Sequence, residues 1–556
     1  MNPLVFKSNF PDVNVPLQDL PTFYFGRMRQ HATFTGSDGQ PPRPLLVDSS
    51  DASQVLTLDE LESFTTQLAS GMHHTVGVRP GDMVAIVLPN TIYYLAISLA
   101  VLMLGATCTT ANPAYTAEEL ARQLADAQAK FIITSRASLQ TISSAIGLMV
   151  QPPPSLMQLH RSVLCIEKST AETATDNPIL SIFDVQSQLP FPRIESTDLE
   201  YLRTTPAFVC YSSGTTGLPK GAVLSHHNIT ANIMQICYAL SQVPTSDPLA
   251  PASIIVLPMF HIFGLVSALS MTISGHSTSY MRSFDLTKFL KLVETFQVTM
   301  VMLVPSIINA MIKQASTAHE HDLSSLQWIF IGSGLLSNAS VASFEQIYGS
   351  HIQIMQGYGL TENSGALSIS IPTAKRLSSS GPILPNIEAK VIDDSGQNLS
   401  YGKVGELCFR GPNIMMGYLN NSDATKATID TDGFLLTGDI GYIDENQFVF
   451  VTDRKKELIK FNGFQVAPAE LEGILMQHPH VRDCAVKGVY DQERQTEVPR
   501  AYLVLSDNVP DNLTAQDVVE WVDEKVSYYK KLRGGYVLIP VIPRNASGKI
   551  LRRLLE

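Results

Sequence analysis

A run of glycine and hydroxyl residues with one lysine follows an apolar, strand-like segment at residues 207–210. The run spans Ser212–Gly221 and reads S-S-G-T-T-G-L-P-K-G, with Lys220 as its charged side chain. Such a loop can point backbone N–H groups and hydroxyls into one concavity, where they bind phosphate oxygens while the lysine balances the charge. A Walker A loop would need glycine in place of Pro219 and serine or threonine in place of Gly221. We therefore predict a phosphate site of another kind.

A second motif, Q-G-Y-G-L-T-E at Gln356–Glu362, follows the apolar segment 352–355. Glycines on both sides of Tyr358 let the backbone approach a planar group, and the tyrosine ring offers a face on which that group can stack. Thr361 and Glu362 add a hydroxyl and a carboxylate, which suit a phosphate and a Mg²⁺ ion with its waters. Together with the glycine-rich loop, this motif indicates a nucleotide site rather than a structural turn.

Two further segments carry charged residues that suit a nucleotide. In the first, Asp439 can accept hydrogen bonds from two ribose hydroxyls, and Arg454 can reinforce them. The second is Pro543–Ile550, which reads P-R-N-A-S-G-K-I and lies near the C-terminus. A lysine on a terminal loop, such as Lys549, is usually only solvated, so the residues alone leave its role open.

These motifs, in this order, resemble the signature sequences of the adenylate-forming superfamily, which includes acyl-CoA synthetases, coumarate-CoA ligases, beetle luciferases and peptide-synthetase adenylation domains. The resemblance extends over roughly residues 55–553. It implies an acid–thiol ligase: ATP with Mg²⁺ and a carboxylic acid give an acyl-adenylate and pyrophosphate, and the thiol of CoA then displaces AMP. Because this chemistry joins two anions, it depends on charge neutralisation and alignment.

The resemblance also implies roles for individual residues. Lys549 would bridge the acyl carboxylate and the α-phosphate, Lys220 would act on the phosphates, and His261 would border the carboxylate. Contacts with the nucleotide and CoA are implied for Ser212, Ser213, Gly214, Thr215, Thr216, Gly217, Lys220, Gln356, Gly357, Tyr358, Gly359, Thr361, Asp439, Arg454, Lys456, Gly463 and Gln465. Glu362 and Thr216 would bind Mg²⁺.

The segment that begins at Lys456 resembles the hinge and thiolation segment of coumarate-CoA ligases. The resemblance places Lys456 at the hinge and turns Lys460, a catalytic lysine, and Gln465 toward the site when the thioester forms. Gly463 would let the pantetheine chain of CoA pass. Asn462 stands where those ligases tend to have lysine, which predicts a weaker electrostatic hold on CoA.

The segment P-M-F-H-I-F-G at Pro258–Gly264 resembles the border of the acyl pocket in this family. Coumarate ligases place a tyrosine where Phe263 stands, so a hydroxyl partner for a phenolic substrate is missing. The resemblance assigns to this pocket His261, Phe263, Ser267, Lys313, Gly332 and Ser333. Apolar residues at 300–303 and 331 accompany them, and an aryl or medium-chain aliphatic acid is therefore expected.

Alternating helix and strand patterns must position these motifs in a chain of 556 residues, which is too long for one core. Residues 1 to about 55 look irregular, apart from an amphipathic segment at Phe23–His31. Beyond them, helix–strand alternation predicts stacked α/β layers. It includes a helix capped by Thr116 with Glu119 three residues on, a strand at residues 131–134 and a helix that opens near Ser225. We predict an α/β protein with a large, multi-subdomain ATP- and acyl-binding domain at 1–455, whose part at about 386–450 is β-rich. A small, mobile α+β lid domain at 456–556 would follow the hinge.

Composition narrows the class of protein. The formal net charge of 39 − 51 = −12 argues against binding of nucleic acid, because such a protein needs a basic face. Six cysteines without a C-x-x-C pair indicate reduced thiols and no zinc site. The apolar runs 92–108 and 254–274 are interrupted by glycine or by proline and histidine, so no integral membrane segment is expected.

The expected partners are a small carboxylic acid, ATP and CoA. A cytoplasmic location is expected because the N-terminus lacks the apolar core of a signal peptide; a peroxisomal one would follow if a C-terminal targeting tripeptide had been trimmed. Two alternatives for function stay open. A stand-alone adenylating enzyme would load the thiol of a carrier protein, although the chain contains no Leu-Gly-Gly-x-Ser phosphopantetheine site. A luciferase-like oxygenase would share these motifs but have a luciferin-specific signature.

Overall fold

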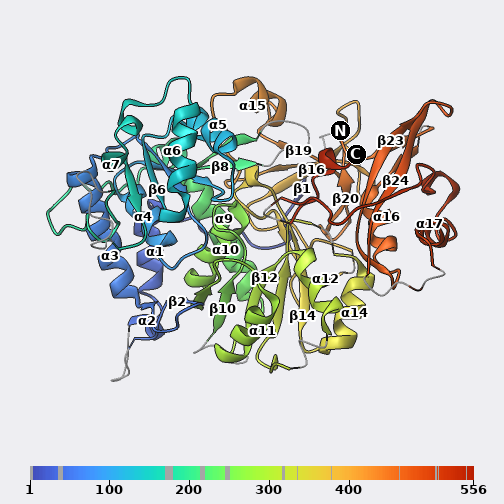
Figure 1. The fold of residues 1–556 in the computed structure, drawn as a ribbon, viewed down its shortest axis with the longest axis horizontal. Coiled ribbons are helices and arrows are strands. Elements are labelled where there is room, and N and C mark those ends of the chain that lie inside the picture. Colours follow the sequence, from blue (N-terminus) through green and yellow to red (C-terminus); the bar gives the residue numbers. More distant parts are fainter. Residues whose placement is uncertain are drawn as a thin grey trace.

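The computed structural model of the chain contains two large sheets of mainly parallel strands, an antiparallel sheet and a small C-terminal unit (Figure 1). It describes residues 4–35, 42–168, 179–212, 219–244, 251–315, 320–334, 336–376, 378–462, 464–506, 510, 513–545 and 548–556. Among these residues, no helix is long and apolar enough to cross a membrane.

The first large sheet has seven strands in the order β18-β9-β8-β5-β4-β6-β7. They are β4 (Met83–Val87), β5 (Thr107–Ala111), β6 (Phe131–Thr134), β7 (Val163–Cys165), β8 (Pro206–Ser212), β9 (Lys220–Ser225) and β18 (Gly417–Tyr418). Strands β4 to β8 run parallel, whereas β9 returns antiparallel to β8 and β18 is antiparallel to β9. The blue to teal helices beside it in Figure 1 include α3 (Leu58–Gly71), α4 (Tyr94–Met103), α5 (Ala117–Ala127), α6 (Leu139–Leu148) and α7 (Leu159–Ser162).

The second large sheet has eight strands in the order β15-β14-β13-β12-β10-β11-β2-β3. They are β2 (Leu46–Asp48), β3 (Val55–Leu56), β10 (Ala252–Ile255), β11 (Ser277–Tyr280), β12 (Met300–Leu303), β13 (Trp328–Ile331), β14 (Gln353–Tyr358) and β15 (Ser368–Ile369). The helices that follow its strands or lie beside them are α1 (Leu20–Met28), α2 (Ala32–Thr35), α10 (Ile262–Ile273), α11 (Leu286–Thr295), α12 (Pro305–Lys313) and α14 (Asn338–Tyr348). Helices α8 (Leu199–Thr204) and α9 (His226–Ser241) contact β9 of the seven-stranded sheet, and α9 also packs against α10.

Local sequence explains where several helices begin. The side chains of Thr57, Thr116 and Ser225 each accept a hydrogen bond from the backbone N–H three residues on, and the side chain at that position accepts one from the backbone N–H of the cap residue. These reciprocal bonds satisfy amides that would otherwise lack partners at the start of α3, α5 and α9. The predicted cap at Thr116 and the predicted opening of a helix near Ser225 are therefore confirmed.

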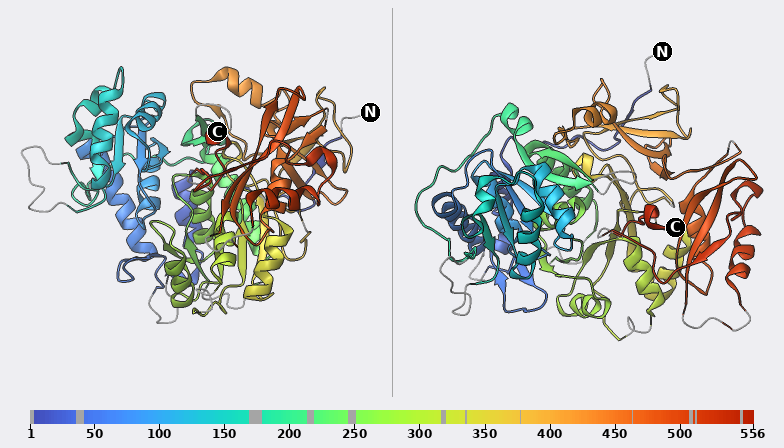
Figure 2. Two further views of the ribbon diagram at one scale, coloured as in Figure 1. Left: turned by 45° about the vertical axis from the view of Figure 1, so that its right-hand side comes forward. Right: turned by 45° about the horizontal axis from the view of Figure 1, so that its top comes forward.

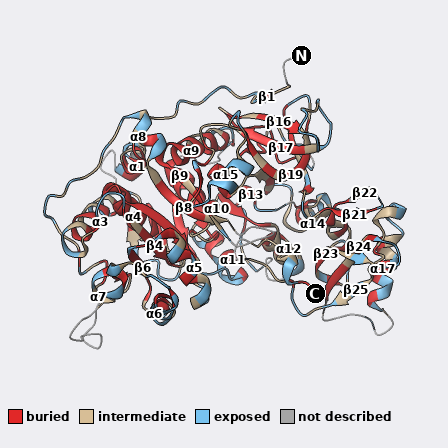
Figure 3. Cartoon of the chain, turned by 90° about the horizontal axis from the view of Figure 1, so that it is seen from above, coloured by how far each residue is buried: buried red, intermediate tan, exposed pale blue. Residues whose placement is uncertain are grey.

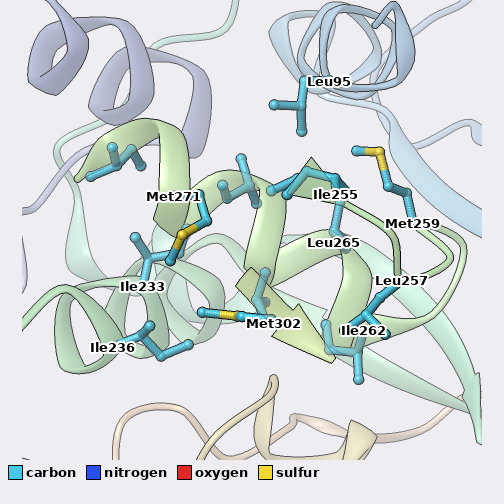
Figure 4. Packing of buried hydrophobic residues seen from close by; sticks show 14 of the residues in the cluster. Leu95, Ile233, Ile236, Ile255, Leu257, Met259, Ile262, Leu265, Met271 and Met302 are labelled. Carbon is cyan, nitrogen blue, oxygen red and sulfur yellow. The ribbon is translucent and has the colours of Figure 1, made fainter. Parts of the chain in front are cut away.

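A continuous hydrophobic core joins the two large sheets and their helices. Buried residues, red in Figure 3, follow α4, α9, α10 and the strands of both sheets. All ten residues of α4 are buried, which explains why its sequence is apolar on every side. Figure 4 shows part of the core around α10, with labelled residues Leu95, Ile233, Ile236, Ile255, Leu257, Met259, Ile262, Leu265, Met271 and Met302.

A third, antiparallel sheet of five strands has the order β1-β16-β17-β19-β20. Its strands are β1 (Phe6–Lys7), β16 (Glu388–Ile392), β17 (Gly405–Arg410), β19 (Leu435–Ile443) and β20 (Val449–Arg454), with α15 (Ser422–Thr428) before β19. Because β1 joins this sheet while β2 and β3 join the eight-stranded one, the prediction of an irregular N-terminal segment is wrong for these residues.

The chain after β20 forms a smaller α+β unit, red in both views of Figure 2. It contains the hairpin β21 (Ile459–Phe461) and β22 (Phe464–Val466), the sheet β23 (Val481–Asp491), β24 (Thr496–Leu505) and β25 (Tyr536–Leu538), and helices α16 (Pro468–Leu475) and α17 (Ala515–Asp523). Its apolar residues make a hydrophobic cluster of their own. The predicted fold class is confirmed, while the domain boundary at residue 456 stays a prediction.

Candidate active site

A cavity of about 1620 Å³ lies between the eight-stranded sheet, the β-rich sheet and the small C-terminal unit. Many of the sequence-predicted residues line it: Ser212, His261, Phe263, Ser267, Lys313, Gly332, Ser333, Gln356, Gly357, Tyr358, Gly359, Thr361, Glu362, Asp439, Arg454 and Lys549. Strands β12, β13 and β14 are parallel and in register, so the residues that follow them meet at one edge of the sheet. Motifs far apart in the sequence therefore share one space.

A β-hairpin holds the two ends of the glycine-rich loop. Ser212 ends β8, Lys220 begins β9, and the two residues are cross-strand partners. The Lys220 ammonium lies 4.4 Å from the centre of the Tyr418 ring. Five loop residues lie outside the described part of the chain, so their proposed contacts stay predictions: Ser213, Gly214, Thr215, Thr216 and Gly217.

A tyrosine, an aspartate and an arginine make a cluster at the cavity wall. The Tyr358 hydroxyl donates to Asp439 Oδ2 at 2.6 Å, and Arg454 Nε lies 2.6 Å from Asp439 Oδ1. Asp439 and Arg454 are partners on β19 and β20, so the register of the β-rich sheet sets this ion pair. The Asp439 side chain is only 2% exposed. The predicted ribose-binding pair and the predicted adenine-stacking tyrosine thus belong to one hydrogen-bonded unit.

The motif around Tyr358 differs from expectation in two details. Strand β14 continues through Tyr358, because Gly357 and Tyr358 pair with β15, whereas the sequence placed the motif after the strand. A side chain at Gly359 would place its Cβ 1.7 Å from the Gly365 carbonyl oxygen. Glycine is therefore required at 359 by the packing of its own loop. The Gln356 side-chain oxygen accepts a hydrogen bond from Leu336 N at 3.1 Å.

Glu362 lies in a short 3₁₀ turn with the buried Thr361. Its Oε1 accepts a hydrogen bond of 2.8 Å from the Tyr418 hydroxyl. The described residues contain no cluster of three or more His, Cys, Asp or Glu side chains that could hold a metal. Mg²⁺ often uses only one or two carboxylates, with waters and phosphates as its other ligands. A carboxylate with a hydroxyl beside it fits this hard cation.

Lys549 reaches the cavity on the C-terminal loop. Its N–H donates to Asn545 Oδ1 at 2.8 Å, and Asn545 N donates to the Lys549 carbonyl at 2.9 Å. Burial and the nearby Arg454 lower the pKa of Lys549 to about 8, against the opposing effects of Glu457 and Asp439. The small unit is therefore docked with its terminal lysine beside the Asp439–Arg454 pair.

The lowered pKa predicts a pH dependence. If Lys549 neutralises the reacting anions, as the resemblance to adenylate-forming enzymes implies, kcat/KM for ATP in the adenylation step should fall as pH rises through about 8, because the ammonium then loses its proton. This pH dependence would be measured between pH 7 and pH 10 by the ATP–pyrophosphate exchange that requires the carboxylic acid substrate. Lys549→Arg keeps its charge over this pH range. This variant should therefore have a lower exchange rate than wild type, but its rate should fall less at alkaline pH. If the activity of this variant falls at the same pH as that of wild type, a group other than Lys549 causes the fall.

Contacts between the large and small units hold this orientation. Ala469 N donates to Asp453 Oδ2 at 3.1 Å, and the Lys313 ammonium donates to the Val481 carbonyl at 3.1 Å. Lys313 lines the cavity as predicted, but its ammonium ties α12 to the small unit. Within the small unit, Arg552 ties the C-terminal segment to the turn after β20 and to α16, since it lies 2.6 Å from Glu457 Oε2 and 2.6 Å from Glu472 Oε1. None of the sequence motifs pointed to Arg552, since its partners lie far from it in the sequence.

The predicted acyl region has apolar walls. The Phe263 ring packs over Gly332, where an added Cβ would lie 2.8 Å from the ring. Ser267 donates to the Phe263 carbonyl at 2.5 Å and lies 2.9 Å from Met302 Sδ, so its hydroxyl is used within the wall. His261 Nδ1 accepts from Phe263 N at 3.3 Å. Burial lowers the pKa of His261 to about 4, which makes its imidazole a neutral Nε2–H donor at pH 7.

The residues predicted for thioester formation lie elsewhere. Lys460 is exposed on β21, pairs with Gln465 across the hairpin and does not line the cavity. Lys456 is also exposed, in the turn between β20 and β21. Gly463 and the side chain of Gln465 lie outside the described part of the chain. Lys549 and Lys460 are therefore not together in the cavity.

Comparison with known proteins fits this arrangement. Residues 34–419 match the model of the AMP-binding enzyme family, and residues 470–549 match its C-terminal domain. The chain is 33% identical to a probable 4-coumarate–CoA ligase of Dictyostelium discoideum, over 99% of this chain and 97% of the relative. It is 34% identical to a phenylacetyl-CoA ligase of Aspergillus niger, over 98% of this chain and 97% of the relative.

A solved structure of o-succinylbenzoate-CoA synthetase from Bacillus subtilis, in complex with an acyl-adenylate intermediate, has a TM-score of 0.76. It is 26% identical, over 95% of this chain and 97% of that one. The chain belongs to the AMP-binding enzyme family and is therefore an enzyme of the adenylate-forming superfamily.

Proposed function

We propose that the protein is an acyl-CoA ligase that activates an apolar aryl or medium-chain aliphatic acid with ATP and transfers the acyl group to CoA. The observation that carries this proposal is the meeting of Lys549, from the small unit, with the Asp439–Arg454 pair and Glu362 of the large unit. Such an arrangement supplies charge where two anions must approach each other. The curated relatives named above, which are CoA ligases, support the second substrate.

In the first step, a carboxylate oxygen attacks the α-phosphorus of ATP and the bond to pyrophosphate breaks. Asp439 and Arg454 bind the ribose, Tyr358 offers its ring to the adenine, and Lys549 lies between the carboxylate and the α-phosphate. Neutral His261 donates its Nε2–H toward the carboxylate. Mg²⁺, when bound by Glu362 and Thr216, neutralises charge on the phosphates. Alignment and charge compensation account for the rate, without a general base.

In the second step, the thiol sulfur of CoA attacks the acyl carbon, AMP leaves with the transferred oxygen, and the thiol proton is released. Lys460 is exposed and outside the cavity, so this step requires the small unit to turn about Lys456 and present its β21–β22 hairpin. Gln465 and Gly463 would then face CoA. A carrier-protein thiol is the alternative acceptor, and the hairpin face would have to fit its phosphopantetheine arm.

The acyl pocket yields a prediction about substrates. Because Phe263 and the Met302 side of the pocket offer no hydroxyl partner, a buried phenol would lose a hydrogen bond at a cost of about 1–3 kcal/mol. We expect cinnamate, phenylacetate or hexanoate to exceed 4-coumarate in kcat/KM, measured by ATP–pyrophosphate exchange. A tenfold or greater preference for 4-coumarate would contradict this interpretation.

Gly332→Ala tests whether the Phe263 ring lines the acyl pocket. The added Cβ would lie 2.8 Å from the Phe263 ring, so the ring must move into the cavity. We expect the larger aryl acids to lose activity relative to hexanoate, while ATP affinity stays within about twofold. Gly334→Ala is the matched control, because its Cβ would meet only Pro305 at an ordinary 3.5 Å. If activity falls equally for aryl and aliphatic acids, the assignment of Phe263 to the acyl pocket is wrong.

The experiment that tests the function is ATP–pyrophosphate exchange with a panel of aryl and aliphatic acids, repeated with CoA and with the product mass measured. An acid-dependent exchange and an acyl-CoA product would support the proposal. Acid-dependent exchange without transfer to CoA would favour the carrier-protein alternative, and light emission with oxygen would favour an oxygenase.

A further inference from the structure

Tyr418 stands between two residues of the proposed site that are far apart in the sequence. Its hydroxyl donates to Glu362 Oε1 at 2.8 Å, and its ring carries the Lys220 ammonium at 4.4 Å from the ring centre. The side chain is 9% exposed, so both contacts are formed largely away from water. One side chain thus contacts the predicted magnesium carboxylate and the lysine of the phosphate loop.

The backbone around Tyr418 is fixed from both sides. Tyr418 pairs with Ala222 in the seven-stranded sheet, and Leu419 N donates to the Gly221 carbonyl at 2.8 Å. On the other side, Met415 N donates to the Glu362 carbonyl at 2.9 Å. The short strand β18 therefore attaches the Glu362 turn to β9, the strand that begins with Lys220.

Two threonines of α15 also fix the backbone amide and the hydroxyl of Tyr418. Thr425 Oγ1 accepts a hydrogen bond from Tyr418 N at 2.8 Å, and the Thr428 side chain hydrogen-bonds to the tyrosine hydroxyl. The tyrosine hydroxyl in turn donates to Glu362 Oε1. With Oε1 of Glu362 held in this way, the orientation of Oε2 is set as well.

We propose that Tyr418 is a positioning residue that aims the Glu362 carboxylate at the metal through its hydroxyl and holds Lys220 at the phosphate loop through its ring. This inference rests on the proposed function, since it takes Glu362 as the magnesium ligand and Lys220 as a phosphate contact. Groups that orient a metal ligand typically contribute 10–100-fold to metal affinity or activity. A cation over an aromatic ring is held by the electrostatic attraction of the ring face.

Two substitutions separate the two contacts. Tyr418→Phe keeps the ring under Lys220 and removes the hydroxyl from Glu362, whereas Tyr418→Leu removes both. The effects of the two contacts on ATP affinity can be measured by calorimetry without the carboxylic acid substrate, because no turnover then occurs. ATP binding in EDTA reports the contribution of Lys220. The gain in ATP affinity on adding Mg²⁺ reports the contribution of Glu362. The magnesium midpoint of pyrophosphate exchange is a second readout.

For Tyr418→Phe we expect metal-free ATP affinity within about twofold of wild type and a gain from Mg²⁺ that is smaller by roughly tenfold. Tyr418→Leu should lose this gain and also weaken metal-free binding by roughly threefold to tenfold. Tyr24→Phe is the matched control, because it removes a buried tyrosine hydroxyl that donates to Thr272, outside the cavity. It should change neither measurement.

Glu362→Gln makes the outcome decisive. If it reduces the gain from Mg²⁺ while Tyr418→Phe does not, the carboxylate binds the metal without help from Tyr418 and the inference is overturned. If Tyr418→Phe weakens metal-free binding as much as Tyr418→Leu, the two contacts are not separate and the inference is again overturned. If Glu362→Gln leaves magnesium dependence unchanged, the metal assignment in the proposed function fails first.

Discussion

Replacing Lys549 by alanine should slow acyl-adenylate formation roughly 10²–10³-fold, the effect of losing one preorganised charge donor. Lys549 lies beside the Asp439–Arg454 pair, where it can meet the α-phosphate and the carboxylate together. Thioester formation from supplied acyl-adenylate should survive, because in the proposed mechanism that step uses another face of the small unit. The two half-reactions would be assayed separately. Pyrophosphate exchange measures adenylate formation, and the CoA-dependent release of AMP from purified acyl-adenylate measures thioester formation.

Lys460→Ala is the reciprocal variant. Lys460 is exposed on β21, 89 residues before Lys549 in the sequence and in a different part of the same unit. A rigid unit does not present both lysines to one cavity at once, so Lys460→Ala should spare pyrophosphate exchange and slow transfer to CoA. Lys456→Pro should also spare adenylation, because it restricts a backbone angle that the turn must change. Equal impairment of one half-reaction by both alanine variants would refute two orientations.

Asp439→Ala should weaken ATP binding by roughly 10²-fold or more, because it removes hydrogen bonds between a carboxylate and the ribose hydroxyls. It should also destabilise the fold by about 3–5 kcal/mol, since Arg454 loses the partner of a largely buried ion pair. Calorimetric ATP titration and denaturant unfolding would measure the two effects.

Asp430→Ala is the control for this variant. It removes the 2.6 Å ion pair between Lys390 and Asp430, which lies by the same antiparallel sheet but outside the cavity. Stability should fall while ATP affinity stays within about twofold. Unchanged ATP affinity in folded Asp439→Ala protein would place the ribose elsewhere.

Local patterns explain how much of the fold the sequence predicts. The strand at residues 131–134, the cap at Thr116 and the start of the helix near Ser225 depend on neighbouring residues, and all three were predicted from the sequence. The strands at 6–7 and 46–48 were not predicted. They contain two or three residues, and their partners in β16 and β11 lie hundreds of residues away. Such short strands form because the rest of the sheet is already in place.

In the candidate site too, residues in local motifs were predicted from the sequence, whereas a residue defined by long-range contacts was not. Tyr358, Glu362, Asp439 and Lys549 were found because each lies in a local motif, and the structure gathers them around one cavity. Tyr418 was missed, since its contact with Glu362 spans 56 residues and no short pattern marks it. Its importance is visible only when β18 is paired with β9.

In the proposed mechanism, a carboxylate oxygen is joined to the α-phosphate of ATP before the acyl group reaches CoA. A single-turnover reaction with ¹⁸O-labelled phenylacetate, or with whichever acid the exchange screen selects, tests this order of steps. The AMP released should carry one ¹⁸O atom, together with pyrophosphate without label and one equivalent of acyl-CoA. Label in orthophosphate, or AMP without label, would contradict the acyl-adenylate route.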